Sequence, residues 1–442
     1  MSRRLAVFLG LLAAAALAGA APAEPSASEA ADDLIAHILQ APPPRPTAKP
    51  GGVPGPAPAA AGPAPIVMGA RIGEHTDMTR FVVELSDPVA MRVFTLSNPN
   101  RVVIDMPAVQ WHLDDAQRPT GTGAVRSYRY GLFRPGNSRF VIDLNRPMTV
   151  SEPRVLPPSG GYGYRVVIDL KPTSSDVFDR RAGWPSDLRA REAAAEQLAA
   201  LPPSPLPPAR EKRIIVIDAG HGGIDSGTSG INGLMEKDLV LDEALRLGRE
   251  LVRRANYTVH LTRDSDVYIP LKERVSIARS WHADLFISLH ADSNPDASVS
   301  GLSIYTLSES GSDKEAAALA RKENQSDVIA GVDLGGGNST VAPILLSLAQ
   351  RDTMNRSSRF AAGAVAMLAS ATDILPRQPH RAAGFVVLKA PDVPAVLIEL
   401  GYLSNEGDAT QMNSVRWRNG VAKAIAGAVD SYFGATATAG FP

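Results

Sequence analysis

The C-terminal half of the chain contains two histidines and two glutamates whose positions favour metal chemistry. His221 lies in the glycine-rich stretch 218–223, directly after a predicted strand, while His290 and Glu399 each end a predicted strand. Glu236 precedes a predicted helix. Two histidines and a glutamate from separate elements match the three protein ligands of a catalytic zinc ion, whose fourth position is left to water. A further carboxylate could act as general base, and a zinc ion with one base suffices for amide hydrolysis.

These residues also have simpler interpretations. A histidine after a strand can be an ordinary loop residue, and a glutamate at a strand end can be a salt-bridge partner. The glycines around His221 suggest a phosphate-binding turn, but neither a Walker Lys-Ser/Thr nor a Gly-x-Gly-x-x-Gly pattern is present. The other histidines lack the combination of glycine loop and strand end, and we interpret them as surface or core residues: His37, His75, His112, His260, His282 and His380.

Alternating strands and helices predict how the four residues come together. The predicted strands cover 214–218, 258–262, 285–290, 303–307, 385–388 and 395–400, and the predicted helices cover 237–254, 272–281, 313–330, 344–368 and 416–433. This alternation is typical of an α/β fold with a largely parallel sheet. Ligands collect where the carboxyl ends of such strands open into loops, so we expect one site at that edge.

The N-terminal half is predicted to be all β, with an internal repeat. Four related β-branched runs begin at Arg80, Arg101, Arg139 and Arg165, and turn signals separate them. This pattern predicts two small packed sheets. Because no cluster of histidines and carboxylates is found there, we expect a binding module that raises the local substrate concentration of a neighbouring enzyme, with a spacer as the alternative.

Composition excludes several classes of protein. A formal charge of -1 lacks the basic excess that nucleic-acid binding needs, so no nucleic-acid partner is expected. The absence of cysteine excludes disulfides, thiolate nucleophiles and iron-sulfur clusters, and leaves any metal to His, Asp or Glu. Nothing in the sequence indicates an oligomer, and a monomer is the default expectation.

The N-terminus predicts export. Arg3 and Arg4 precede an apolar run at 5–17 and several small residues, which is typical of a cleaved signal peptide. An uncleaved membrane anchor would need about 20 apolar residues, so no stable membrane insertion is expected. Ser2-Arg3-Arg4 leaves both the Sec and the twin-arginine route open.

Proline-rich stretches divide the rest of the chain. The predicted organisation is a signal peptide at 1–23, a Pro/Ala-rich tether at 24–65, a β domain at 66–171, a linker at 172–212, an α/β domain at 213–435 with an insertion at about 308–345, and a tail at 436–442.

Four motifs in order over about 190 residues resemble the zinc-dependent N-acetylmuramoyl-L-alanine amidases of cell-wall turnover. They are Val216-Ile-Asp-Ala-Gly-His-Gly-Gly-Ile-Asp-Ser-Gly227, Glu236-Lys-Asp238, Ile287-Ser-Leu-His-Ala-Asp292 and Ile398-Glu-Leu-Gly-Tyr-Leu-Ser-Asn405. The resemblance implies Zn²⁺ held by His221, Glu236 and His290, and Glu399 as the catalytic glutamate. It also implies cleavage of the amide between N-acetylmuramic acid and L-alanine.

The repeat domain resembles the AMIN domain, which binds peptidoglycan in related amidases. The whole arrangement looks like the periplasmic division amidases of Gram-negative bacteria, which implies a role in daughter-cell separation. The alternatives are a non-catalytic peptidoglycan-binding scaffold with a degenerate amidase domain, and a zinc peptidase cutting within the stem peptide.

The insertion between His290 and Glu399 is longer than hydrolysis needs. In related division amidases an inserted helix lies over the zinc with an acidic side chain in the water position. Glu323 and Asp327 are four residues apart on one predicted helical face, so either could reach the metal; Glu323 is favoured. The resemblance implies a periplasmic activator protein that displaces the helix. A solvated acidic helix face is the alternative.

Overall fold

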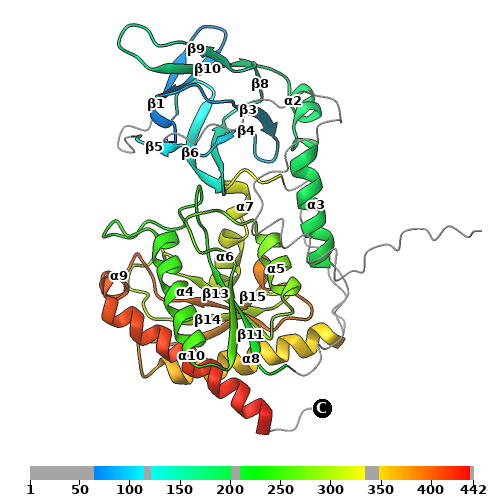
Figure 1. Cartoon of the computed structure of the whole chain (residues 1–442), viewed down its shortest axis with the longest axis vertical. Helices are drawn as coiled ribbons and strands as arrows, with labels where there is room; N and C mark the ends of the chain where they lie inside the picture. Colours follow the sequence, from blue (N-terminus) through cyan, green and yellow to red (C-terminus); the bar gives the residue numbers. More distant parts are fainter. Residues whose placement is uncertain (1–63, 114–120, 201–209, 334–347, 439–442) are drawn as a thin grey trace, which may run out of the picture. The chain divides into compact units, whose positions relative to one another are not determined.

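The computed structural model describes residues 64–113, 121–200, 210–333 and 348–438 (Figure 1). The predicted signal peptide, nearly all of the tether, the proline run at 201–208 and part of the insertion lie outside these residues. Among the described helices, none is both long and apolar enough to cross a membrane.

The prediction of an all-β N-terminal region with two sheets is confirmed. One sheet has the order β5-β1-β2-β10-β8 with β9 beside β10, and the other has the order β3-β4-β7-β6. The strands are β1 Ile66–Glu74, β2 Thr79–Leu85, β3 Arg92–Leu96, β4 Arg101–Pro107, β5 Gln110–Trp111, β6 Val125–Arg134, β7 Asn137–Leu144, β8 Met148–Val150, β9 Arg154–Leu156 and β10 Tyr164–Pro172. Alternate side chains such as Phe81 and Phe140 form one buried core.

The internal repeat explains how the two sheets are paired. β2 of the first repeat pairs with β10 of the second, and β4 of the first pairs with β7 of the second. Ion pairs link the same positions of the repeats, because Arg80 lies 2.6 Å from Asp169 and Arg139 lies 2.6 Å from Asp105. Each sheet therefore combines one of the related strands from each repeat.

The C-terminal region is the predicted α/β fold, with a mixed sheet. Its strands have the order β12-β11-β13-β16-β14-β15. The bounds are β11 Arg213–Ala219, β12 Tyr257–Leu261, β13 Leu285–His290, β14 Ser303–Leu307, β15 His380–Ala383 and β16 Ala395–Glu399. The first four strands of this order are parallel, whereas β14 is antiparallel to β16 and β15 is parallel to β14.

One predicted strand is wrong. Residues 385–388 form the 3₁₀ turn η2 (Val386–Leu388), and the strand at this place is the preceding β15. Phe385, Val387 and Leu388 are buried in the core, which explains why the run is apolar. A short apolar run does not by itself distinguish a strand from a turn.

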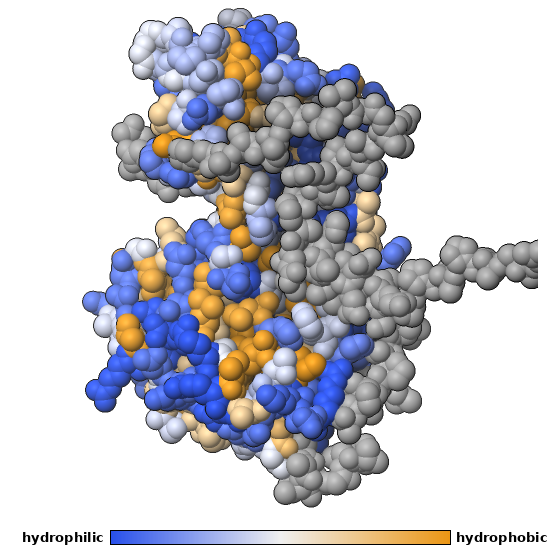
Figure 2. All heavy atoms as spheres, viewed as in Figure 1, coloured by the Kyte–Doolittle hydropathy of each residue, from blue (hydrophilic) through white to orange (hydrophobic). Residues whose placement is uncertain are grey.

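The predicted helices of the α/β region are present, one of them interrupted. The helices are α2 Ser175–Arg181, α3 Ser186–Ala200, α4 Glu236–Arg253, α5 Leu271–Ser280, α6 Lys314–Glu323, α7 Ser326–Ile329, α8 Leu348–Leu368, α9 Glu406–Asn413 and α10 Val415–Thr438. Of these, α2 and α9 were not predicted. α4, α8 and α10 share one apolar core with the sheet. In Figure 2, hydrophobic residues gather between α4 and α5 and hydrophilic residues surround them. The predicted helix 313–330 is divided into α6 and α7 at Asn324.

Candidate active site

Adjacent parallel strands bring the predicted residues to one edge of the sheet. β13 and β16 are neighbours, and their register places His290 directly opposite Glu399. β11 lies on the other side of β13, and His221 follows two residues after β11 ends. The carboxyl ends of three neighbouring strands therefore position three of the four residues, as the sequence predicted.

The glycine-rich loop around His221 comes close to His290 and Glu236. His221 has a φ of 57°, and two glycines with positive φ follow it. A Cβ on Gly220 would lie 2.5 Å from the ring of His290, and a Cβ on Gly227 would lie 2.6 Å from Glu236 Oε2. Glycine at these positions thus lets the loop approach the histidine and the glutamate.

Four side chains converge on one point, which we call the metal-site cluster: His221, Glu236, His290 and Glu323. Glu236 Oε1 lies 3.0 Å from His221 Nε2 and 3.2 Å from His290 Nδ1. Glu323 Oε2 lies 3.4 Å and 3.2 Å from the same nitrogens. Ligands about 2.0–2.1 Å from a tetrahedral zinc ion lie about 3.3 Å apart. The donors fit zinc, and within the described residues His221 Nε2 has no hydrogen-bond partner.

The charges of the cluster also favour a cation. Burial lowers the pKa of His290, but Glu323 and Glu236 outweigh it and raise that pKa to about 10. Burial also lowers the pKa of His221, but Glu236 and Asp225 outweigh it and raise that pKa well above its usual value. Burial would raise the pKa of Glu236, yet the two histidines hold it well below its usual range. Positive charge therefore stabilises the buried carboxylates, and either protons or a metal ion can provide it.

Glu399 has the properties of a proton-transfer group beside this cluster. The residue is fully buried, Oε2 accepts a hydrogen bond from the backbone N–H of Asp292 at 3.1 Å, and Oε1 has no partner in the described part of the chain. Burial, reinforced by Asp292, Glu236 and Glu323, raises the pKa of Glu399 well above its usual value. A buried carboxyl group whose pKa is raised in this way is suited to accept a proton from a neighbouring group.

Two supporting residues were missed by the sequence reasoning. Asp225 Oδ2 lies 2.9 Å from Nδ1 of His221, and a partner of this kind fixes the ring and its tautomer. Its signal was present, because Asp225 lies in the same motif. Arg274 on α5 donates to the carbonyl oxygens of Ala219 at 2.6 Å and His221 at 2.7 Å. Nothing in the predicted helix marked this arginine.

Residues 322–327, which we call the cover segment, lie directly on the site. Glu323 belongs to the metal-site cluster and is 6% exposed. Lys322 forms an ion pair with Asp292, and the hydroxyl of Ser326 donates to Asp225. The segment therefore contacts the cluster and also the residues that support it.

The structure separates the two acidic candidates of the insertion. Asp327 accepts hydrogen bonds from the Tyr268 hydroxyl at 2.8 Å and from the backbone N–H of Leu271 at 3.0 Å, at the start of α5. α6 ends at Glu323 with Asn324 as its C-cap, and the Asn324 side chain donates to the Gly384 carbonyl and accepts from the Val386 N–H. Glu323, and not Asp327, therefore lies beside the histidines.

Little space remains at the cluster. The cavity lined by His221, His290 and Glu323 has a volume of about 10 Å³, which is about the volume needed for a single water. In this arrangement the cavity at the histidines has no room for a group larger than a water.

Known proteins provide the context for this geometry. The chain matches the N-acetylmuramoyl-L-alanine amidase family over residues 215–431 and the AMIN domain over 69–156. It is 32% identical to N-acetylmuramoyl-L-alanine amidase AmiC of Escherichia coli O6:H1 over 84% of this chain and 90% of that protein. It is 33% identical to AmiC of Neisseria meningitidis serogroup B over the same shares.

A solved structure is also similar. Amidase AmiC2 of Nostoc punctiforme is 25% identical, with a TM-score of 0.38 over 51% of this chain and 99% of that one. Because the chain covers 90% of relatives to which it is 32–33% identical, it belongs to the N-acetylmuramoyl-L-alanine amidase family and carries an AMIN domain.

Proposed function

We propose that this chain is a periplasmic zinc amidase that cleaves the bond between N-acetylmuramic acid and the L-alanine of the stem peptide during cell separation. The main support is the position of Glu236 Oε1, which lies 3.0 Å from His221 Nε2 and 3.2 Å from His290 Nδ1. Glu399 is paired with His290 across the adjacent strand. The relatives named as N-acetylmuramoyl-L-alanine amidases supply the substrate. The AMIN domain is the part proposed to bind peptidoglycan.

His221, Glu236 and His290 would hold the zinc ion. Zinc bound there would polarise the scissile carbonyl and lower the pKa of the attacking water. Asp225 at Nδ1 of His221 leaves the other ring nitrogen free to act as a ligand. Glu399, whose pKa is raised by burial, takes the proton of the water and passes it to the leaving amide nitrogen.

The described arrangement is proposed to be the inhibited state. Glu323 Oε2, 3.4 Å from His221 Nε2 and 3.2 Å from His290 Nδ1, would keep the attacking water out, and the cavity of about 10 Å³ would exclude substrate. An activator protein in the periplasm would have to bind the released state more tightly than this state. Each tenfold shift of the population requires about 1.4 kcal/mol of difference in binding free energy.

Digestion of purified sacculi by the zinc-loaded full chain tests this proposal. We expect the Glu323→Ala variant to release peptides with a free L-alanine amino terminus. A chelator should stop the release and added zinc should restore it. Adding Glu399→Gln should reduce the rate about a thousandfold while the zinc content is unchanged. Mass analysis of the products is the measurement. Cleavage within the stem peptide would instead show a peptidase, and binding without cleavage by any variant would favour a scaffold.

A further inference from the structure

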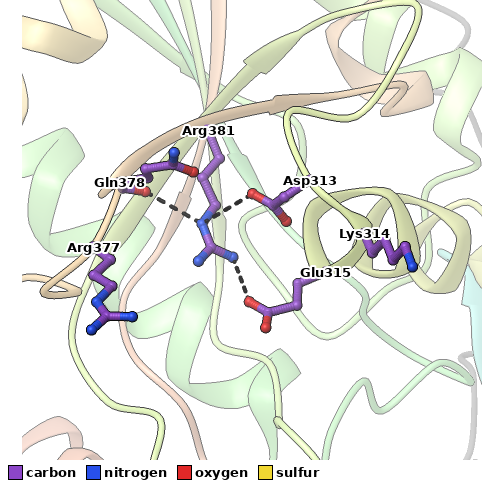
Figure 3. A pocket seen from close by; sticks show the side chains of 6 residues that line it. All are labelled: Asp313, Lys314, Glu315, Arg377, Gln378 and Arg381. Atoms are coloured by element: carbon purple, nitrogen blue, oxygen red, sulfur yellow. Dashed lines mark hydrogen bonds and ion pairs between the residues drawn. The ribbon is translucent and has the colours of Figure 1, made fainter.

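Arg381 is a nearly buried cation at the outer side of the active-site sheet. It lies on β15, which is separated from the Glu399 strand by β14, and its side chain is only 10% exposed. The guanidinium donates to Glu315 Oε2 at 3.0 Å and to the carbonyl of Gln378 at 3.3 Å, and lies 3.7 Å from Asp313 Oδ2 (Figure 3). The arginine is therefore held between two carboxylates.

Two cavities meet at this side chain, in contrast to the closed space at the histidines. The outer one, shown in Figure 3, has a volume of about 720 Å³. The inner one has a volume of about 760 Å³ and extends to Asp292, Tyr305 and Tyr402. Both tyrosines are close enough to Glu399 for its charge to raise their pKa, although burial is the larger cause. The inner cavity thus runs from Arg381 toward the site.

The carboxylates that neutralise Arg381 come from the inserted helix. Asp313 is the N-cap of α6 and Glu315 is in its first turn, while Glu323 at the other end of α6 enters the metal-site cluster. Two lysines also line the inner cavity: Lys322 has its own partner in Asp292, and Lys314 is an exposed residue of α6 itself. If α6 is displaced, Arg381 keeps the Gln378 carbonyl and loses both carboxylates.

We propose that Arg381 binds a carboxylate of the stem peptide, and that Glu315 with Asp313 occupies this position in the closed state. An arginine presents a planar fork of donors that suits a carboxylate. This inference rests on the proposed function, because stem peptides of peptidoglycan carry carboxylates beyond their first alanine. In the closed state, Glu315 and Glu323, near the two ends of α6, would then occupy positions that the substrate takes in the open state.

The length of α6 indicates which carboxylate is bound. Glu315 and Glu323 are eight residues apart, and a helix rises about 1.5 Å per residue, which gives about 12 Å. An extended peptide covers about 3.3 Å per residue, so 12 Å corresponds to three or four residues. The carboxylate recognised by Arg381 therefore belongs to the third or fourth residue of the stem.

Two synthetic muramoyl-tetrapeptides test the proposal, one with free carboxylates on residues three and four and one with both amidated. In the zinc-loaded full chain carrying Glu323→Ala, we expect at least a tenfold lower KM for the free acid. Arg381→Gln in this background should abolish that preference with kcat changed less than twofold, and Arg381→Lys should retain part of it. Arg377→Gln is the matched control, because Arg377 lines only the outer cavity.

An unchanged preference in the Arg381→Gln variant, with normal zinc content and thermal stability, would overturn the proposal. If this variant does not fold, an unchanged preference in Arg381→Lys has the same meaning. If the Glu323→Ala chain cleaves neither substrate, the proposed function fails. Calorimetry with the free-acid tetrapeptide then decides separately: at least tenfold weaker binding to Arg381→Gln supports the carboxylate site, and equal binding overturns it.

Discussion

The metal-site cluster and the cover segment meet at Glu323, but they are built in different ways. The cluster and the neighbouring Glu399 depend on the backbone, since His290 and Glu399 are paired residues of adjacent strands and glycines beside His221 allow its close approach. The cover segment is attached by side chains: Lys322 to Asp292, Ser326 to Asp225 and Asp327 to the start of α5.

This difference has an energetic meaning. Moving His290 would disrupt β13, whose apolar side chains belong to the main core. Releasing the cover segment would break a few polar contacts, each worth about 0.5–1.5 kcal/mol net, or more when a charge is involved. In the proposed mechanism, the activator would have to supply this free energy, and the cover segment would move while the strands stay in place.

The largest effect should come from the contact that joins the two regions. We expect Glu323→Ala to raise the basal hydrolysis of peptidoglycan about tenfold to a hundredfold, because a ligand position becomes free for water. The initial rate of peptide release from sacculi measures this. Glu323→Gln, which keeps the shape and removes the charge, shows whether the carboxylate is needed. An unchanged rate in Glu323→Ala and in its double variant with Asp327→Ala would show that the cover segment does not block the metal-site cluster.

A smaller effect is expected at the ion pair of the cover segment. The side chain of Lys322 is 48% exposed, and a pair screened to this degree contributes about 0.2–1 kcal/mol. Lys322→Ala should therefore raise the basal rate about two- to fivefold, and added salt should raise the wild-type rate more than that of the variant. Arg321→Ala removes a neighbouring positive charge and serves as the control. Equal rates in wild type and Lys322→Ala would show that this pair does not hold the cover.

The smallest effect on catalysis is expected at Asp327, which should affect stability instead. Burial raises the pKa of Asp327 above its usual 3.8, so the folded state binds the proton more tightly than the unfolded state. Its contribution to stability is present below pH 3.8 and is lost as the pH rises through the raised pKa.

Asp327→Asn cannot ionise and should therefore lose less stability than wild type as the pH rises above about 4. Thermal unfolding of both proteins at several pH values, at constant ionic strength, measures this. Hydrolysis by Asp327→Asn should remain within about twofold of wild type, because the asparagine side-chain oxygen can still accept the hydrogen bonds from Tyr268 and Leu271 that hold the cover segment here. Parallel melting curves across the pH range would contradict this assignment.

The same contrast explains how much the sequence could predict. His221, His290 and Glu399 could be predicted to meet because the ends of neighbouring parallel strands share an edge. The choice between Glu323 and Asp327 needed the structure, since a four-residue spacing implies one face only while the helix is continuous, and α6 ends at Glu323 before α7 begins at Ser326. Arg274 and the misplaced strand at 385–388 depend on tertiary contacts that short sequence patterns do not encode.

The backbone at His221 has a consequence for protein engineering. A non-glycine residue at a φ of 57° carries a conformational cost of about 1–3 kcal/mol, and glycine would largely avoid it. Selection of a variant library for thermal stability alone would thus favour glycine at this position and discard a proposed metal ligand. Stabilised versions of this fold would have to keep residue 221 fixed, because a strained backbone conformation belongs to the histidine on which the proposed chemistry depends.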